Sequence, residues 1–418
     1  MPSLSLRFNQ RNKLEMTKGI NDLQPERLEQ ALAARGLTKG QLASLVGVAA
    51  PTVTKWCKGD QSPEAHTFER LASVLNVQPE WLTRPTLQAV SAPLFRSNAS
   101  ALKAARAKLE ARTEWVQEVA SILSEYVDYP KIGLPQREFK DPEQISDADI
   151  EAAADECRTL WQLGRGPIQN LVLAAESAGI VVAREETEIS AIEGLSSWSE
   201  LLGRPIVLLS ADKANGFRSR FDLAHEIGHL VLHKHIPRAD ERDRYNQMEK
   251  QAHRFAGALL LPAETFTREV RVPTNLDNLL VLKQRWGTSV AAMMMRLHAL
   301  GLLSDEDKLA LFKRRSARWG SKAEPGDDKW SPELPRLLRR TVELLVSEGI
   351  LPVESLPRHL GFSPLDIQKL CGLRSNYFEA PGEIVDLATL RSARSNGQVA
   401  AHPDKTPGSV LSFLNFKK

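Results

Sequence analysis

The sequence predicts an α+β fold that is mostly helical. We expect an N-terminal domain of five helices, a central domain with a small sheet of three or more strands, and a C-terminal helical accessory region. Residues 24–85 contain five short helical patterns separated by turn residues. Three strand-like apolar runs lie between residues 180 and 210. After residue 218, apolar residues at helical spacing surround a polar cluster, which predicts a buried helix that carries chemistry.

Length, charge and cysteine content limit the possible classes of protein. With 418 residues the chain is long enough for two or three domains. The net charge of +3 is nearly balanced, so a nucleic-acid partner must be inferred from local motifs. The three cysteines, Cys57, Cys157 and Cys371, are far apart, which fits a reducing cytoplasm and argues against cysteine metal ligands. Because no apolar run is long enough to span a bilayer, we expect a soluble cytoplasmic protein without a membrane partner.

Composition and helical spacing also predict the domain boundaries. One long connecting helix is expected over Ala101–Tyr126, which is rich in Ala, Glu, Lys and Arg. The predicted segments are a flexible arm at 1–23, the five-helix domain at 24–85, a linker and the connecting helix at 86–130, a metal-site domain at 131–314, a second linker at 315–332, the accessory region at 333–378 and an irregular tail at 379–418.

Residues 24–85 are predicted to form a helix-turn-helix. Its helices end at glycines, and the helix Ala50–Lys58 would enter the major groove of DNA. Val53 and Trp56 should face the core. The side chains expected to face outward and contact DNA are Thr52, Thr54, Lys55 and Lys58. Ala49 provides a weak N-cap, so a helical bundle that binds protein, or that has lost DNA affinity, remains an alternative.

Three strands are predicted ahead of the polar helix, at Ile180–Ala183, Ile192–Trp198 and Arg204–Ser210. A sheet edge beside an active site can pair with the extended backbone of a substrate. We expect either Ile206–Leu209 or Glu193–Ser197 to serve in this way, and the alternative is that both strands are internal.

The polar cluster is an HExxH motif, His225-Glu226-Ile227-Gly228-His229. Residues four apart on an α-helix lie one above the other, so His225 and His229 can bind the same cation. Zinc is the expected cation because it favours neutral imidazole nitrogens and, at catalytic sites, keeps a position open for water. Glu226 would lie beside that water and act as the general base.

A third ligand is expected from the next helix, and Glu249 is the candidate. Its spacing from Ala252 and Phe255 places it on a buried helical stripe, where a lone carboxylate needs an opposite charge. A salt bridge from Glu249 to Arg254 or Arg220 is the alternative. Competing ligands in a polar, loop-like stretch are His235, Asp240, Glu241 and Asp243. Candidates for stabilising the oxyanion or supporting a ligand are His233, His235 and Tyr245.

Two resemblances sharpen these expectations. The run Arg220–His233, followed by Glu249-x-x-Ala252-x-x-Phe255-Ala256 and Leu260-Leu261-Pro262, resembles the ImmA/IrrE family of zinc metallopeptidases. The resemblance implies a zincin-like, gluzincin-type domain in which His225, His229 and Glu249 bind zinc and Glu226 is the base. It also implies a substrate among helix-turn-helix repressors, which several family members cleave.

The N-terminal domain resembles the Cro/C1-type (XRE) repressor domain. The matching residues are Ala33-x-Arg35-Gly36-Leu37-Thr38-x-x-Gln41-Leu42-Ala43 and Gly59-x-x-x-Pro63. The resemblance implies that Gln41 contacts the DNA backbone or a neighbouring recognition residue. It also implies a homodimer, because such domains pair to match two half-sites.

The resulting hypothesis is a DNA-binding regulator fused to an endopeptidase that holds one zinc ion per chain and cuts a repressor-type protein. Two alternatives remain. One is a transcriptional repressor or antitoxin-like regulator whose metal domain senses a ligand or supports structure without proteolysis; against it, a structural zinc site needs no base such as Glu226. The other is a binding module without metal.

Overall fold

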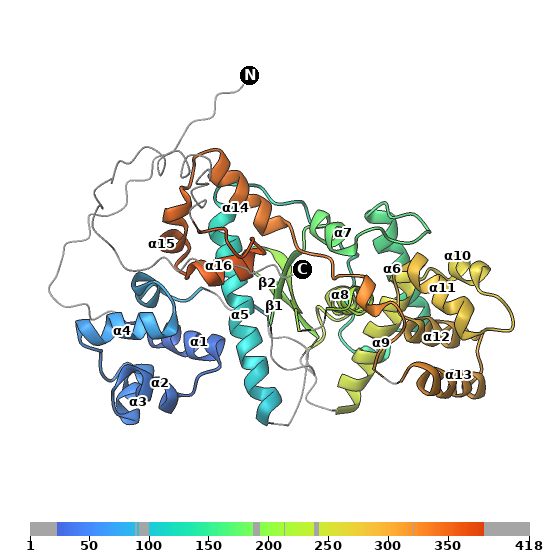
Figure 1. Ribbon diagram of the computed structural model, residues 1–418, viewed down its shortest axis with the longest axis horizontal. Coiled ribbons are helices and arrows are strands. Elements are labelled where there is room, and N and C mark those ends of the chain that lie inside the picture. Colours follow the sequence, from blue (N-terminus) through green and yellow to red (C-terminus); the bar gives the residue numbers. More distant parts are fainter. Residues whose placement is uncertain are drawn as a thin grey trace, which may run out of the picture. The chain divides into compact units, whose positions relative to one another are not determined.

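The computed structural model describes residues 23–87, 90–91, 100–186, 193–212, 214–237, 242–320 and 322–379. It confirms a mostly helical α+β protein with one small three-stranded sheet in these segments (Figure 1). The expected N-terminal arm lies outside the described residues except for residue 23, and so does the tail beyond residue 379. The candidate ligands Asp240 and Glu241 also lie outside them.

The N-terminal domain has the five helices that were predicted. They are α1 (Pro25–Arg35), α2 (Lys39–Val46), α3 (Ala50–Lys58), α4 (Ala65–Leu75) and the 3-10 helix η1 (Pro79–Thr83). The first three helices end at Gly36, Gly47 and Gly59, whose left-handed backbone suits glycine. Val53 and Trp56 of α3 are buried, as predicted, and Ala49 makes no side-chain cap.

The predicted long helix is α5 (Ser100–Ser124). It contacts α1 on one side and strands β2 (Gly194–Ser199) and β3 (Arg204–Ser210) on another. Arg27 of α1 donates hydrogen bonds to the Glu118 carboxylate of α5, with a shortest N–O distance of 2.6 Å. This buried ion pair attaches the five-helix domain to the connecting helix.

The sheet has the order β1-β3-β2, where β1 is Val181–Glu185. β3 lies in the centre, parallel to β1 and antiparallel to β2, and all its inner positions are buried. The expectation that Ile206–Leu209 forms a substrate edge is therefore wrong, because both sides of β3 are occupied by strands. β2, which contains most of Glu193–Ser197, is an edge strand of the described sheet.

Two helices of the central domain, α8 (Gly216–Leu232) and α9 (Arg242–Leu260), pack against each other. The others of the central domain are η2 (Pro142–Gln144), α6 (Asp147–Leu160), α7 (Leu171–Ser177), α10 (Ala263–Glu269), α11 (Leu276–Trp286), α12 (Val290–Ala299) and α13 (Asp305–Trp319).

Residues 315–332 are packed against the domain, although the sequence predicted a linker there. Helix α13 continues to Trp319, and η3 spans Asp327–Lys329. Glu324 is buried and accepts hydrogen bonds from the backbone N–H groups of Val290 and Ala291 at 2.8 and 2.9 Å. This carboxylate accepts from backbone N–H groups in the first turn of α12, which have no acceptor within the helix. The contact holds this proline- and glycine-containing segment in place.

The C-terminal helices are α14 (Leu337–Ser347), η4 (Val353–Ser355), α15 (Leu356–Leu360) and α16 (Pro364–Cys371). Asp366 of α16 pairs with Arg35 of α1 at 2.5 Å and with Arg112 of α5 at 2.7 Å. The rings of Phe362, Trp81 and Trp115 contact one another, with centroids 4.8–5.6 Å apart. The accessory region therefore contacts both the five-helix domain and the connecting helix.

Candidate metal centre

Helix α8 carries the HExxH motif and is buried along most of its length. Its first turn is capped by the Asn215 side chain, which accepts a hydrogen bond from the Arg218 N–H at 3.0 Å. A Cβ atom on Gly216 would lie 2.6 Å from the backbone oxygen of Ser331. Only glycine fits this close approach, which anchors the start of the helix.

Gly228 lets α8 and α9 approach each other closely. A Cβ atom there would lie 3.2 Å from the Cα of Ala252 and 3.1 Å from the Phe255 ring on α9. These neighbours show that Gly228 allows the two helices to pack closely. This contact brings the buried face of α9, and Glu249 with it, opposite the two histidines.

The structure brings His225, His229 and Glu249 together. The two imidazole Nε2 atoms are 3.0 Å apart. The Glu249 carboxylate oxygens lie 3.4 Å from the Nε2 of His225 and 3.4 Å from that of His229. In a tetrahedral zinc site with bonds of about 2.0–2.1 Å, ligand atoms are separated by about 3.3 Å. Each of the three distances is therefore close to the spacing of two ligand atoms on one zinc ion, with a different Glu249 oxygen facing each imidazole.

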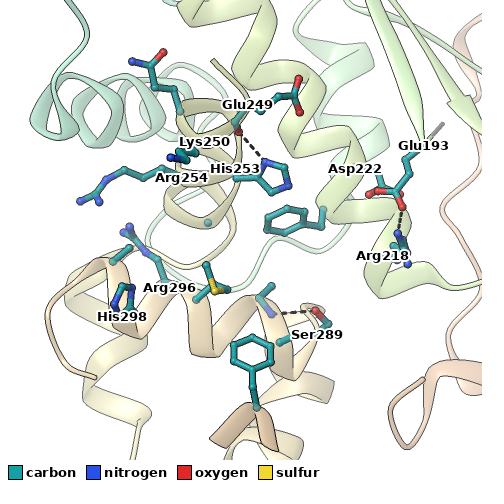
Figure 2. Close-up of a pocket in the computed structure, with 18 of the residues that line it drawn as sticks. Glu193, Arg218, Asp222, Glu249, Lys250, His253, Arg254, Ser289, Arg296 and His298 are labelled. Carbon is teal, nitrogen blue, oxygen red and sulfur yellow. Dashed lines mark hydrogen bonds and ion pairs between the residues drawn. The ribbon is translucent and has the colours of Figure 1, made fainter. Parts of the chain in front are cut away.

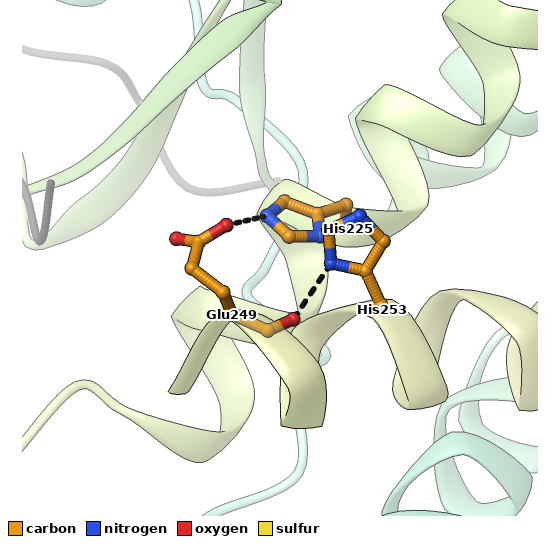
Figure 3. Close-up of side chains that lie close together, drawn as sticks. All are labelled: His225, Glu249 and His253. Atoms are coloured by element: carbon orange, nitrogen blue, oxygen red, sulfur yellow. Dashed lines mark hydrogen bonds and ion pairs between the residues drawn. The ribbon is translucent and has the colours of Figure 1, made fainter. Parts of the chain in front are cut away.

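His253 lies beside this triad and was not singled out from the sequence. It follows Glu249 by one turn of α9, and its ring centroid is 4.4 Å from that of His225 (Figure 3). One atom each of His225, Glu249 and His253 also lie within 4.8 Å of one another. We favour the set with His229, because it belongs to the HExxH motif and is buried, whereas His253 is exposed. Nδ1 of His253 donates to the Glu249 carbonyl at 2.7 Å, which leaves its Nε2 unprotonated.

The charges at the site suit a bound cation. Burial opposes ionisation of Glu249, but the neighbouring imidazoles of His225 and His229 lower the pKa of its carboxyl well below the usual range. Burial lowers the pKa of His225, but the hydrogen bond to Glu249 and the negative charges of Glu226 and Glu249 outweigh it and raise this pKa. A carboxylate thus remains charged at a largely buried position, where it needs a positive partner.

The arginines proposed as alternative partners of Glu249 are engaged elsewhere. Arg254 pairs with Asp147 at 2.9 Å, and Arg220 pairs with Glu333 at 2.8 Å. Asp243, a competing ligand, is exposed in the first turn of α9. Of the carboxylates considered that lie in the described residues, Glu249 is the one that reaches the histidines.

Glu226 is buried and lies against the first residue of the edge strand β2. A Cβ atom on Gly194 would be 3.2 Å from the Cγ of Glu226 and 3.3 Å from its Oε1. Glycine at this position leaves the space that the carboxylate occupies. Sequence reasoning missed Gly194, because nothing local relates it to a residue 32 positions further on.

The three residues nominated for the oxyanion occupy different places. Tyr245 is half-buried, and its hydroxyl donates to Glu249; burial and this acidic neighbour raise its pKa above the normal range, so it keeps its proton. His233 is fully buried behind His229, and burial followed by the charge of His229 lowers its pKa to about 3. His235 is half-buried, and no hydrogen bond or ion pair within the described chain joins it to the triad.

A cavity of about 1430 Å³ opens beside Glu249 and His253 (Figure 2). Its lining is strongly charged, and it includes the ion pair of Arg218 with Glu193. Arg296, which also lines it, pairs with Glu151 at 2.5 Å. His225, His229 and Glu226 do not line this cavity, so it borders the triad on the Glu249 side.

The residues expected to contact DNA lie on the surface of the five-helix domain. Lys55 and Lys58 on α3 are exposed, whereas Thr52 and Thr54 are half-buried. The Gln41 side-chain carbonyl accepts a hydrogen bond from the Thr38 backbone N–H at 2.9 Å, in a capping box that starts α2. Gln41 is exposed and retains its amide N–H donors for a further contact.

Fold and site together define a helix-turn-helix domain joined to a domain of the metallopeptidase class. Residues 28–82 match the family model described as Helix-turn-helix, and residues 175–298 match that of the IrrE N-terminal-like domain, a peptidase family. The chain is therefore a fusion of an XRE-type helix-turn-helix domain with an IrrE/ImmA-like peptidase domain, from a family that is zinc-dependent in general. The comparison with curated proteins gave no match. None of the described helices is long and apolar enough to cross a membrane.

Proposed function

We propose that the protein is a DNA-binding regulator whose fused domain is a zinc-dependent endopeptidase. In this proposal one zinc ion is held by His225, His229 and Glu249, and Glu226 is the general base. The observation that carries it is a set of three distances: 3.0 Å between the two imidazole Nε2 atoms, and 3.4 Å from each of them to a Glu249 carboxylate oxygen. These distances are close to the spacing of two ligand atoms on a tetrahedral zinc ion.

A zinc ion supplies Lewis acidity and a more acidic water molecule when it is bound. Glu226, enclosed between α8 and β2, accepts the proton of the attacking water and later transfers it to the leaving amine. Tyr245 is the best placed of the three candidates to donate a hydrogen bond to the developing oxyanion, because it keeps its proton beside Glu249. Its single O–H donates to Glu249 in the structure and would turn from that carboxylate to the oxyanion as the charge develops.

The substrate backbone is proposed to pair with the edge of β2. Trp198 exchanges hydrogen bonds with Ser91, whose N–H donates to the Trp198 carbonyl at 2.8 Å. The backbone groups of Gly194 and Ser196 point to this same edge, since alternate residues of an antiparallel strand do so. A peptide paired there would pass beside Glu226, which packs on Gly194.

The proposed partners follow from the two domains. DNA binds to residues 24–85, with Gln41, Thr52, Thr54, Lys55 and Lys58 as the contacting residues. The protein substrate is a repressor-type regulator, and the regulator itself is a homodimer that matches two DNA half-sites. The boundaries proposed for the two domains are 24–85 for the DNA-binding domain and 131–314 for the peptidase domain.

The decisive experiment compares wild type with Glu226→Gln, which keeps the proposed ligands and removes the base. Both proteins are loaded with zinc, checked by elemental analysis for one ion per chain, and incubated with purified helix-turn-helix repressors. Cleavage by wild type alone supports the peptidase. If zinc is bound and neither protein cleaves any of them, the result favours a regulator whose metal domain acts without proteolysis. Exposed Glu64→Gln is the matched control and should cleave like wild type.

A further inference from the structure

We propose that Pro142, Gln251 and His233 form a hydrogen-bonded relay that determines which nitrogen of His229 is available to a metal ion. Gln251 and His233 are then positioning residues, acting through His229. This inference rests on the proposed zinc site, and it concerns a part of the structure that lies behind the ligands, away from the substrate.

The relay begins with the side-chain amide of Gln251 on α9. Its Nε2 lies 2.7 Å from the backbone oxygen of Pro142 and 3.4 Å from that of Ile145. Both oxygens can only accept, so the amide nitrogen must be the atom that faces them. The Gln251 oxygen then points in the other direction, where it lies 3.0 Å from the Nε2 of His233.

The second step fixes the tautomer of His233. Because the Gln251 oxygen is an acceptor, Nε2 of His233 must carry a proton and donate it. His233 has no solvent exposure, and its two hydrogen-bond partners within the described residues are this amide and the imidazole of His229. No acid is hydrogen-bonded to it to stabilise a second proton, so Nδ1 of His233 keeps its lone pair.

The third step fixes His229. Its Nδ1 lies 3.0 Å from the Nδ1 of His233, and one of these two atoms must donate. Since the His233 atom has only a lone pair, the proton belongs to Nδ1 of His229. A neutral imidazole carries one proton, so Nε2 of His229 is unprotonated. This is the atom that lies 3.0 Å from His225 Nε2 and 3.4 Å from Glu249.

The two histidines of the HExxH motif differ in whether their Nδ1 atom has a hydrogen-bond partner. Nδ1 of His225 is buried and has no hydrogen-bond partner among the described residues. The orientation and tautomer of His229 are therefore fixed before a metal ion binds. The backbone just before α6 fixes them through the relay. Such partners behind a ligand typically change metal affinity by about 10- to 100-fold.

The first test needs no metal. Nitrogen-15 NMR of the imidazole groups in the zinc-free full-length protein at neutral pH reports which nitrogen carries the proton. We expect a proton on Nδ1 of His229 and on Nε2 of His233. A proton on Nε2 of His229, or on Nδ1 of His233, would overturn the relay.

The second test measures zinc affinity by competition with a chelator. His233→Phe keeps the volume and removes the acceptor, and Gln251→Met removes the amide at nearly constant size; we expect each to weaken zinc binding about 10- to 100-fold. His233→Asn should recover most of the affinity, because its side-chain oxygen stands near the position of Nδ1. Thr341→Val is a control for loss of a buried hydrogen bond far from the site, and it should bind zinc like wild type.

The outcomes separate this inference from the proposed function. Wild-type zinc affinity in both Gln251→Met and His233→Phe contradicts the relay while leaving the zinc site intact. If wild type binds no zinc, the proposed function fails, and the NMR measurement still decides the relay. If His233→Phe fails to fold, zinc affinity is measured with Gln251→Met alone, because the methionine side chain fits the space of the glutamine.

Discussion

Gly228 of α8 lies so close to Ala252 of α9 that a Cβ atom on the glycine would be 3.2 Å from the Cα of the alanine. This contact lies one residue before His229 and three residues after Glu249. The spacing of the two helices at this point therefore sets the distance between the imidazole and the carboxylate. Such contacts, together with the charged groups described above, lead to the following predictions.

Gly228→Ala should weaken zinc binding more than it weakens the fold. Overpacking costs about 1–3 kcal/mol, and the better helix propensity of alanine offsets about 1 kcal/mol of that. We expect a small decrease in the free energy of unfolding and at least a several-fold loss of zinc affinity, because the helices must move apart. Urea denaturation and chelator competition measure the two quantities. Unchanged affinity together with higher stability would show that the helix spacing does not position the triad.

Gly194→Ala should reduce peptidase activity while the protein remains folded and binds zinc. The new methyl group would press on the Cγ and Oε1 of Glu226 and on the Leu209 side chain, which lie 3.2–3.3 Å from its position. A displaced base lowers the rate of proton transfer, and we expect kcat to fall by about 10-fold or more. Zinc content and Tm are measured in parallel. Gly166→Ala, where no atom lies within 4 Å of the added Cβ, should keep the wild-type kcat.

Asp366 should make the stability of the protein depend on acid pH. Burial tends to raise the pKa of this carboxyl, but Arg35 and Arg112 outweigh it and hold the pKa below its ordinary value. Because the pKa is lower in the folded state, the contribution is complete above the unfolded-state value, about 3.9, and is lost as pH falls through the folded-state value. The free energy of unfolding should therefore decrease steeply below about pH 4.

Asp366→Asn should destabilise the protein at pH 7 by about 3–5 kcal/mol, because it leaves two arginines facing a neutral side chain in a buried place. It should also make the decrease in stability below pH 4 shallower. Denaturant melts at pH 7 and at pH 3–4 test both statements. Asp305, whose side chain is 85% exposed, is the control: Asp305→Asn should change stability by less than about 0.5 kcal/mol. Equal effects of the two substitutions would rule out a special role for Asp366.

Loss of Lys55 and Lys58 together should weaken DNA binding regardless of sequence. Each phosphate contact contributes a slope of about 0.9 to the dependence of log affinity on log salt concentration, so the double alanine variant should reduce the slope by about 2. Fluorescence anisotropy with a duplex of arbitrary sequence at several salt concentrations measures this. Lys313→Ala on α13, also exposed, should leave the slope as it is. A double variant with an unchanged slope would favour a protein-binding bundle.

Local patterns were sufficient for much of the architecture. Apolar spacing and turn residues predicted the five short helices and the buried helix α8, and the content of Ala, Glu, Lys and Arg predicted the long helix α5. Four-residue spacing was enough to place His225 and His229 side by side, since one helical turn does this wherever it occurs. The stripe containing Ala252 and Phe255 indicated that Glu249 turns inward, because a helical period records which face is buried.

What lies opposite a buried face was decided only by the tertiary structure. Strand order makes β2 the edge and β3 the centre; the continuous apolar run of β3 indicates burial of both its faces but does not say which strands lie beside it. Local sequence likewise does not indicate that Gly194 lies beside Glu226, that His253 lies beside His225, or that Gln251 lies between His233 and the Pro142 carbonyl. Sequence periodicity reports the direction of a side chain relative to its own element. Its partner depends on the packing of elements far apart in the chain, and the surroundings of the metal centre are built from such contacts.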